Sequence, residues 1–130
     1  MNRIQAIICK PLKNASIETI PNTLETYQRI VEGYIEVRSL EPGIDLIVNE
    51  EGLINGQQPC RVILDQHGRL DFVAYGPIVI VGRDPESGEF KGLTDEQAGS
   101  LAHRFLWAEE MSAEDGLLNV ERFDSDLVEA

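Results

Sequence analysis

The stretch Gly76-Pro77-Ile78-Val79-Ile80-Val81-Gly82 decides how the rest of this chain is read. It is a short, unbroken run of β-branched residues fenced by glycines. Such a run is typical of a β-strand that is covered on both faces, because stiff Val and Ile side chains pack well on a pleated surface. We therefore predict a central buried strand, and we search the flanking sequence for the strands that pair with it and the helices that cover it.

Several other segments carry strand signals, either alternating or short apolar runs bounded by turn residues. Pro42 and Gly43 mark a tight turn between two of these runs, because proline presets φ and glycine tolerates a positive φ. Gly68 marks a second connection of the same kind. The predicted strands span residues 3–10, 34–40, 44–48, 61–65 and 69–73.

Two helices are predicted from capping boxes that precede amphipathic stretches. The first box is residues 22–25, with the Asn22 side chain as the cap, and its helix spans about residues 23–32. The second box is residues 94–97, and its helix runs to about residue 110. Together with the strands, these helices predict an α+β fold, in which a mixed, mainly antiparallel sheet carries both amphipathic helices on one face.

The last twenty residues differ in composition from the rest. Residues 111–130 are rich in carboxylates and hold a single basic residue, Arg122, with apolar residues interspersed. We therefore divide the chain into a single α+β domain of residues 1–110 and an acidic C-terminal tail of residues 111–130. The tail either docks on its own domain or becomes ordered on a partner.

Charge restricts the classes of partner. The 130 residues carry a formal net charge of −12, and 42% of them are hydrophobic, as in a soluble globular protein. An acidic surface repels nucleic-acid phosphates and anionic membranes and attracts basic proteins. We expect a cytoplasmic protein whose partner is a protein with a basic surface, with no direct binding of nucleic acid or membrane.

Chemistry-bearing motifs are scarce. Neither a phosphate-binding glycine loop nor a zinc-ligand spacing occurs in the sequence. Cys9 and Cys60 are interpreted as reduced, half-buried thiols, and His67 and His103 as surface histidines. We predict no catalytic residue, no metal and no cofactor, which leaves an enzymatic role open but less favoured.

The loop after the second strand of the first hairpin is the first candidate binding region. Asn49, Glu50 and Glu51 follow a strand directly, and Arg61 closes the irregular segment that comes next. Loops on a rigid sheet are where binding residues usually lie. The alternative interpretation is a turn that needs Asn49 and Gly52 for backbone reasons, and it predicts a positive φ at Gly52.

Two aromatic residues near the C-terminus are the other candidates. Trp107 falls one position off the apolar stripe of the second helix, where it would be a partly exposed anchor for a partner or lie under the tail. Phe123 is the aromatic residue of the tail. The full set of candidate ligand-binding or partner-binding residues is therefore Asn49, Glu50, Glu51, Arg61, Trp107 and Phe123.

The order of several motifs resembles a known family. The motifs are residues 33–37, 49–52, 59–61, 76–82 and 93–97, and the resemblance covers about residues 3–106. The family consists of small proteins of phages, plasmids and conjugative elements, and it is known as domain of unknown function 3846. The resemblance implies a mobile-element origin and an accessory role, and it transfers no catalytic residue.

These observations favour one function and leave one alternative. The favoured function is a non-enzymatic accessory protein that binds and modulates a host protein, for example by presenting a nucleic-acid-like acidic surface. The alternative is a small enzyme or ligand-binding domain that uses the loops of residues 49–61, with a pocket joining Glu50, Glu51 and Arg61.

Overall fold

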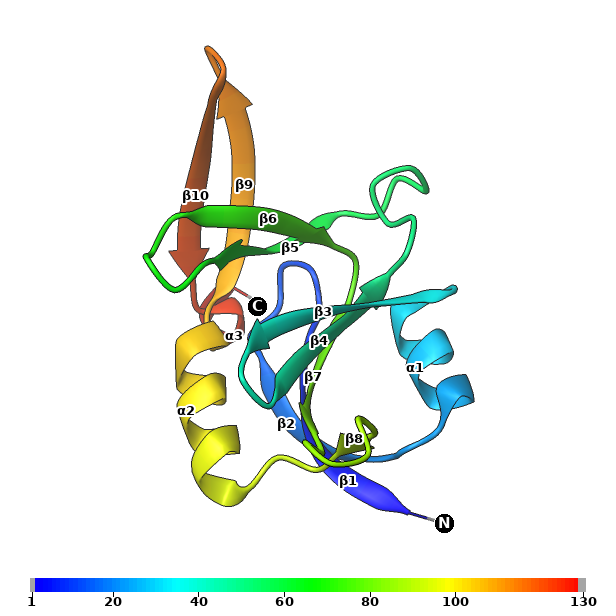
Figure 1. Ribbon diagram of the computed structural model, residues 1–130. Helices are drawn as coiled ribbons and strands as arrows, with labels where there is room; N and C mark the ends of the chain where they lie inside the picture. Colours follow the sequence, from blue (N-terminus) through cyan, green and yellow to red (C-terminus); the bar gives the residue numbers. More distant parts are fainter. Residues whose placement is uncertain (1, 129–130) are drawn as a thin grey trace.

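The computed structural model describes residues 2–128. In the first two-thirds of the chain, most of its helices and strands lie where the sequence predicts them. The chain forms an α+β fold with antiparallel sheets (Figure 1). The elements in chain order are β1 (Arg3–Cys9), β2 (Ser16–Pro21), α1 (Leu24–Val31), β3 (Ile35–Glu41), β4 (Ile44–Asn49), β5 (Pro59–Leu64), β6 (Leu70–Tyr75), β7 (Ile78–Arg83), β8 (Phe90–Lys91), α2 (Asp95–Phe105), β9 (Ala108–Glu114), β10 (Leu117–Phe123) and α3 (Ser125–Val128).

The predicted central strand is β7. It lies in the middle of the large sheet, whose strand order is β2-β1-β7-β4-β3, and the short β8 also pairs with β7. The register places Ile80 opposite Ile7 of β1 on one side and opposite Leu46 of β4 on the other. Residues 78–82 are all buried, as an apolar run without alternation predicts.

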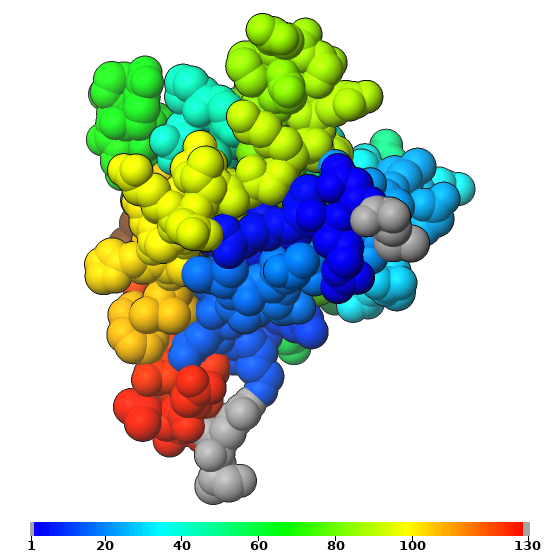
Figure 2. Space-filling view, turned by 90° about the horizontal axis from the view of Figure 1, so that it is seen from below, coloured from blue at the N-terminus to red at the C-terminus, as the bar shows by residue number. Residues whose placement is uncertain are grey.

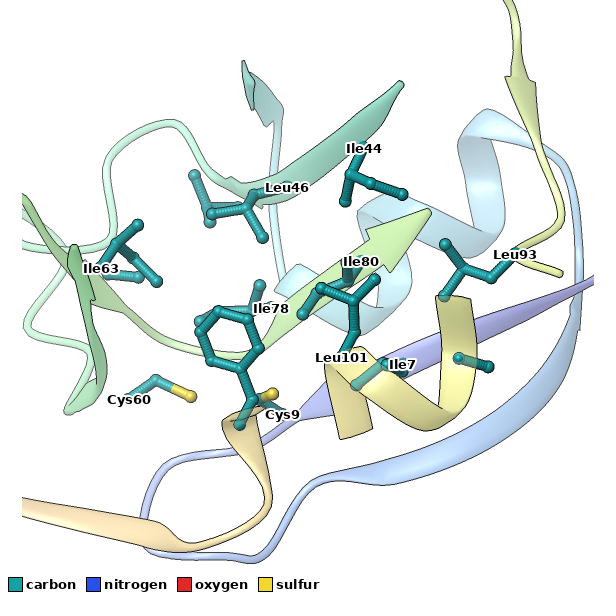
Figure 3. Close-up of a cluster of buried hydrophobic side chains, with 14 residues drawn as sticks. Ile7, Cys9, Ile44, Leu46, Cys60, Ile63, Ile78, Ile80, Leu93 and Leu101 are labelled. Carbon is teal, nitrogen blue, oxygen red and sulfur yellow. The ribbon is translucent and has the colours of Figure 1, made fainter. Parts of the chain in front are cut away.

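The two main helices cover opposite faces of this sheet. Alternate residues of a strand point to opposite faces. Ile78 and Ile80 belong to a buried cluster that contains α2 residues such as Leu101 (Figure 3), whereas Val79 and Val81 belong to a second cluster that contains α1 residues. The prediction that both helices pack on one face is therefore wrong, because the apolar run of β7 needs a cover on each side.

Local chemistry explains where the helices begin. Thr94 caps α2, and both hydrogen bonds of the predicted capping box with Gln97 are present. α1 is capped by Thr23, whose side chain accepts from the backbone N–H of Thr26, so the prediction of Asn22 as the cap is one residue off.

The C-terminal third differs from the prediction. α2 ends at Phe105, about five residues before the predicted end, and residues 108–123 form the hairpin β9–β10. The predicted boundary at residue 111 therefore falls inside strand β9. The predicted acidic tail is a folded β-hairpin followed by the short α3, and residues 129–130 of that tail lie outside the described residues.

Candidate partner-binding surface

The β9–β10 hairpin extends away from the body of the molecule, as the orange and brown strands of Figure 1 show. Its register runs from Ala108 opposite Phe123 to Glu114 opposite Leu117. The turn residues Asp115 and Gly116 have φ values of 53° and 78°. Two positive φ values define the type I′ turn, whose twist matches that of paired strands and which favours Asp-Gly. The sequence of the turn therefore specifies the hairpin.

The hairpin has two chemically different faces. Residues directly opposite each other in an antiparallel pair share a face, and alternate residues change face. The apolar hairpin face, as we name it, consists of Met111, Ala113, Leu118 and Val120, and the ion pair of Glu109 with Arg122 lies at the base of the same face. The acidic hairpin face consists of Glu110, Ser112, Glu114, Leu117, Asn119 and Glu121.

The apolar hairpin face is largely uncovered. Leu118 is 42% exposed, Ala113 is also exposed, and Met111 and Val120 are half-buried. Within residues 2–128, none of these four side chains belongs to either buried cluster. A two-stranded hairpin is marginally stable in water unless something packs on it. The outer part of this face, at Ala113 and Leu118, therefore lacks the cover that the other apolar strand faces have, whereas the part near the base is half-covered.

The base of the hairpin is firmly held. The Glu109 side chain is buried, and its Oε1 accepts a hydrogen bond from the backbone N–H of Val62 at 2.8 Å. Its Oε2 accepts from Nε of Arg122 at 3.1 Å, across the hairpin. One carboxylate thus links β9 to β5 and to β10. The hairpin consequently leaves the body at a fixed position.

Arg61 fixes the segment that leads into the hairpin. Its side chain is fully buried, and the guanidinium donates to the carbonyl oxygens of Phe105, Lys13 and Cys60, with the shortest contact at 2.7 Å to Lys13. Phe105 is the last residue of α2, where the helix dipole favours a cation. Arg61 therefore acts as a structural clamp, and it lies buried in strand β5 and not on an exposed loop.

Asn14 ties both ends of the hairpin to the connection between β1 and β2. Its Oδ1 accepts from the backbone N–H groups of Ser125 at 3.0 Å and Ala108 at 3.4 Å, and its Nδ2 donates to Asp124. Figure 2 shows the result from below, where the red α3 lies beside the blue N-terminal segment. Sequence reasoning missed Asn14, because one loop asparagine carries no signal of partners more than ninety residues away.

The predicted loop site does not assemble. Asn49 is buried, donates to the Val31 carbonyl at 3.0 Å and accepts from the Glu51 backbone N–H at 2.7 Å, so it joins the end of α1 to the turn after β4. Glu50 and Glu51 are exposed on that turn, whereas Arg61 is buried against α2. The predicted pocket joining the two glutamates to Arg61 is therefore not formed.

The two aromatic candidates lie at the base of the hairpin. Trp107 is not on α2 but between α2 and β9, and it is 43% exposed. Phe123 is half-buried and lies opposite Ala108, the residue that follows Trp107. The structure therefore places both aromatic residues at the point where the hairpin leaves the body.

An open groove of about 760 Å³ lies between α1, β1–β2 and the loop of residues 55–58. Its lining includes Ile8 and Ile20 and two cations, Lys10 and Arg29. Gln57, a further lining residue, has a buried Oε1 that finds no hydrogen-bond donor among the described residues. Residues 55–58 of the predicted loop region therefore line this groove, whereas Glu50 and Glu51 do not.

The two cysteines are core residues. Both are fully buried, and Figure 3 shows them within the cluster that faces α2. Burial raises the pKa of Cys9 to about 11 and raises that of Cys60 further, although the Arg61 guanidinium opposes part of the effect. Both thiols are therefore protonated at neutral pH and are poor nucleophiles.

The comparisons with known proteins give one match. Residues 4–106 match the family described as Domain of unknown function (DUF3846). No curated protein and no solved structure matches the chain. Within residues 2–128, no helix is long and apolar enough to cross a membrane, and no cluster of His, Cys, Asp and Glu side chains could hold a metal ion. The family match stops before β9, so the hairpin lies outside it.

Proposed function

The chain belongs to the family Domain of unknown function (DUF3846), and from this premise we propose that it is a non-enzymatic accessory protein of a phage or mobile element. In this proposal it acts in the cytoplasm of the host cell, where it binds and modulates a host protein with a basic surface. The family domain supplies the folded body, and the hairpin beyond residue 106 supplies the contact.

One observation carries this proposal: a hairpin that is held at its base presents an apolar face whose outer half is uncovered, with a row of carboxylates on the reverse side. Glu110, Glu114 and Glu121 are exposed on the acidic hairpin face, and Asp115 is exposed at its tip. Apolar contact area supplies affinity, and complementary charge supplies the rate and the choice of partner. A surface of this composition suits a partner that has an apolar patch bordered by Lys and Arg.

The acidic character extends over the whole chain, which contains 23 acidic and 11 basic residues. A host protein that normally holds nucleic-acid phosphates with Lys and Arg would also attract such a surface. We therefore include competition with nucleic acid in the proposal. Duplex DNA added in excess would then displace the chain from its partner.

The test is a capture experiment from host lysate with the immobilised full chain, followed by mass spectrometry. The proposal predicts a small set of basic proteins that bind at low salt and elute at about 0.5 M salt, because exposed charge pairs are screened there. Captured proteins with no excess of basic surface, or binding that resists salt, would contradict it. A heat-unfolded sample of the same chain is the control for non-specific charge.

A second function, binding of a small ligand, is favoured by the groove beside α1. The buried Gln57 Oε1 lacks a donor among the described residues, and ligand pockets are usually apolar with a few polar groups of this kind. A thermal-shift screen of metabolite pools tests it. A ligand that raises the melting temperature of the full chain but not of an Arg29→Ala variant would support the groove, and a shift equal in both would place the ligand elsewhere.

A further inference from the structure

The apolar hairpin face resembles one side of a protein–protein interface, because no other segment of the described chain covers its outer part. Three of its four side chains are large, and the strands alternate between this face and a polar one. Large apolar side chains gathered on one face of a projecting element mark interaction sites more often than scattered exposed ones do. The acidic hairpin face lies on the reverse side of the same two strands, so an occupant of the apolar face meets carboxylates at the strand edges and at the tip, where Asp115 is exposed.

The net charge of the chain decides which of three binding partners is favoured: a second copy of the chain, nucleic acid or a basic protein. A second copy of the chain would bring an equal formal net charge of −12 toward this one. Nucleic acid would bring its phosphates toward the same net negative charge. Both arrangements place like charges together, which is unfavourable, whereas a basic protein surface would be attracted. Residues 108–128 contain seven carboxylates and one cation, Arg122, which Glu109 already binds.

We infer that Met111, Ala113, Leu118 and Val120 form the docking face for a basic protein, which covers this face with an apolar strip and whose Lys or Arg side chains reach the carboxylates at the edges and the tip of the hairpin. This inference rests on the proposed function and assigns the contact to these four side chains on one face of the hairpin. The contacts of Glu109 and Asn14 at the base hold the face in one orientation, so little conformational entropy is lost on binding.

Defined peptides test the docking face with the full chain. The first peptide alternates leucine and lysine, the second alternates serine and lysine, and the third alternates leucine and glutamate. Amide shifts in an isotope-labelled sample report where each peptide binds. The leucine–lysine peptide should shift residues 109–122 and bind about tenfold or more tightly than the serine–lysine peptide, because it adds the burial of leucine to equal charge. The leucine–glutamate peptide should not bind.

Two variants separate the faces of the hairpin. Leu118→Thr with Val120→Thr keeps the charge and the strand propensity, and it should reduce the leucine–lysine affinity to that of the serine–lysine peptide. Leu117→Thr is the matched control, because Leu117 is 69% exposed but lies on the acidic hairpin face, and its affinity should stay within about twofold of the parent. The spectrum of each variant without peptide is compared with that of the parent chain. Equal amide chemical shifts outside residues 108–123 show that the variant keeps its fold.

Equal affinity for the two lysine peptides would overturn the docking face, and so would full affinity in the double variant. The first result does not depend on whether the double variant folds, because the comparison of the two peptides uses the parent chain. If these tests fail while the lysate capture still yields salt-sensitive basic proteins, only the docking face is wrong. If the capture yields none, the proposed function itself fails, whatever the peptides do.

Discussion

The buried guanidinium of Arg61 organises three segments through backbone carbonyl oxygens rather than through a carboxylate. It bonds to the last residue of α2, to the loop after β1, and to its own strand. Removing a buried charged donor leaves its carbonyl acceptors without partners, at a cost of several kcal/mol. The side chain that sequence reasoning assigned to binding therefore contributes to stability.

We predict that Arg61→Met lowers the free energy of unfolding by about 2–4 kcal/mol. Methionine fills much of the volume but donates no hydrogen bond to Phe105, Lys13 or Cys60. Urea unfolding followed by circular dichroism measures the change. Arg69→Met is the control, since Arg69 is exposed, and it should shift stability by less than about 0.5 kcal/mol. Similar midpoints for the two variants would refute the clamp.

Gly52 is required because a side chain would not fit at this position, and not because its backbone has a positive φ. It is absent from the positive-φ residues of the described chain, so the predicted backbone strain is wrong. A Cβ at this position would instead come within 2.7 Å of the Tyr75 carbonyl oxygen and of Gln57 Oε1. Contacts that short force backbone or side chain to move. The glycine is thus explained by the close approach of the loop to the end of β6.

Gly52→Ala should therefore destabilise the protein by about 1–3 kcal/mol. Gly99→Ala is the opposite control, because a Cβ at Gly99 meets nothing within 4 Å and the residue lies inside α2. Alanine there should stabilise the helix by about 0.5–1 kcal/mol. Thermal melting of both variants gives the comparison, and a neutral effect of Gly52→Ala would mean that the loop moves away at no cost.

At the scale of the element, the hairpin is fixed at its base and exposed at its end. Its base carries the Glu109, Arg122 and Asn14 contacts, whereas its distal strands pack on neither buried cluster in the described structure. The distal half should thus open independently of the domain, since regions with few buried contacts have low local stability.

We predict that Gly116→Val weakens the hairpin without unfolding the domain. Valine at a φ of 78° is strained, and the type I′ turn loses its preferred residue. Hydrogen exchange should accelerate at residues 110–121, while the melting temperature of the domain changes little. Gly88→Val is the matched control, because it strains the β7–β8 loop at a φ of 75°. If Gly116→Val lowers the global stability more than Gly88→Val does, the hairpin end is part of the cooperative core.

At the scale of the whole molecule, the large sheet separates two buried apolar layers, and different elements cover each of them. One layer lies under α1, and the other lies under α2 and the β5–β6 hairpin. The buried thiols and Tyr27 make this core sensitive to alkaline pH. Burial raises the pKa of Cys9 from 9.0 to about 11, and it raises that of Tyr27 from 10.0 to about 12.

Stability should accordingly fall in alkaline solution. The folded state holds these protons more tightly than the unfolded chain, so the contribution is complete below about pH 9 and is lost as the pH rises through about 11 for Cys9 and about 12 for Tyr27. Urea unfolding from about pH 8 to about pH 12 measures the loss. Cys9→Ala should reduce the loss of unfolding free energy between about pH 9 and about pH 11. A parent protein whose unfolding free energy does not change over this range would contradict the burial argument.

Local signals in the sequence were sufficient for much of the fold. The unbroken apolar run predicted β7, the turn at Pro42-Gly43 predicted the β3–β4 hairpin, and the capping box at Thr94 predicted the start of α2. The side of the sheet that each helix covers was not predictable, because β7 offers similar residues to both faces and nothing local distinguishes them. That choice depends on contacts between distant segments.

The candidate surface was only partly predictable. The carboxylates and apolar residues of the C-terminal region were recognised, but they were interpreted as a tail. The missed signal was Asp115-Gly116 between alternating runs, which is the strongest short-range mark of a hairpin. The burial of Arg61 was not predictable, because its acceptors are backbone carbonyl oxygens, which any residue provides.

The most direct test of partner binding through the hairpin is site-specific photocrosslinking in host lysate. Benzoylphenylalanine replaces Leu118 on the apolar hairpin face in one sample and Ile17 on β2 in the other, and both positions are similarly exposed, at 42% and 48%. We predict a discrete adduct from position 118, identified by mass spectrometry as a basic protein and suppressed at about 0.5 M salt, with none from position 17. Identical adducts from both positions, or none from position 118, would contradict the account.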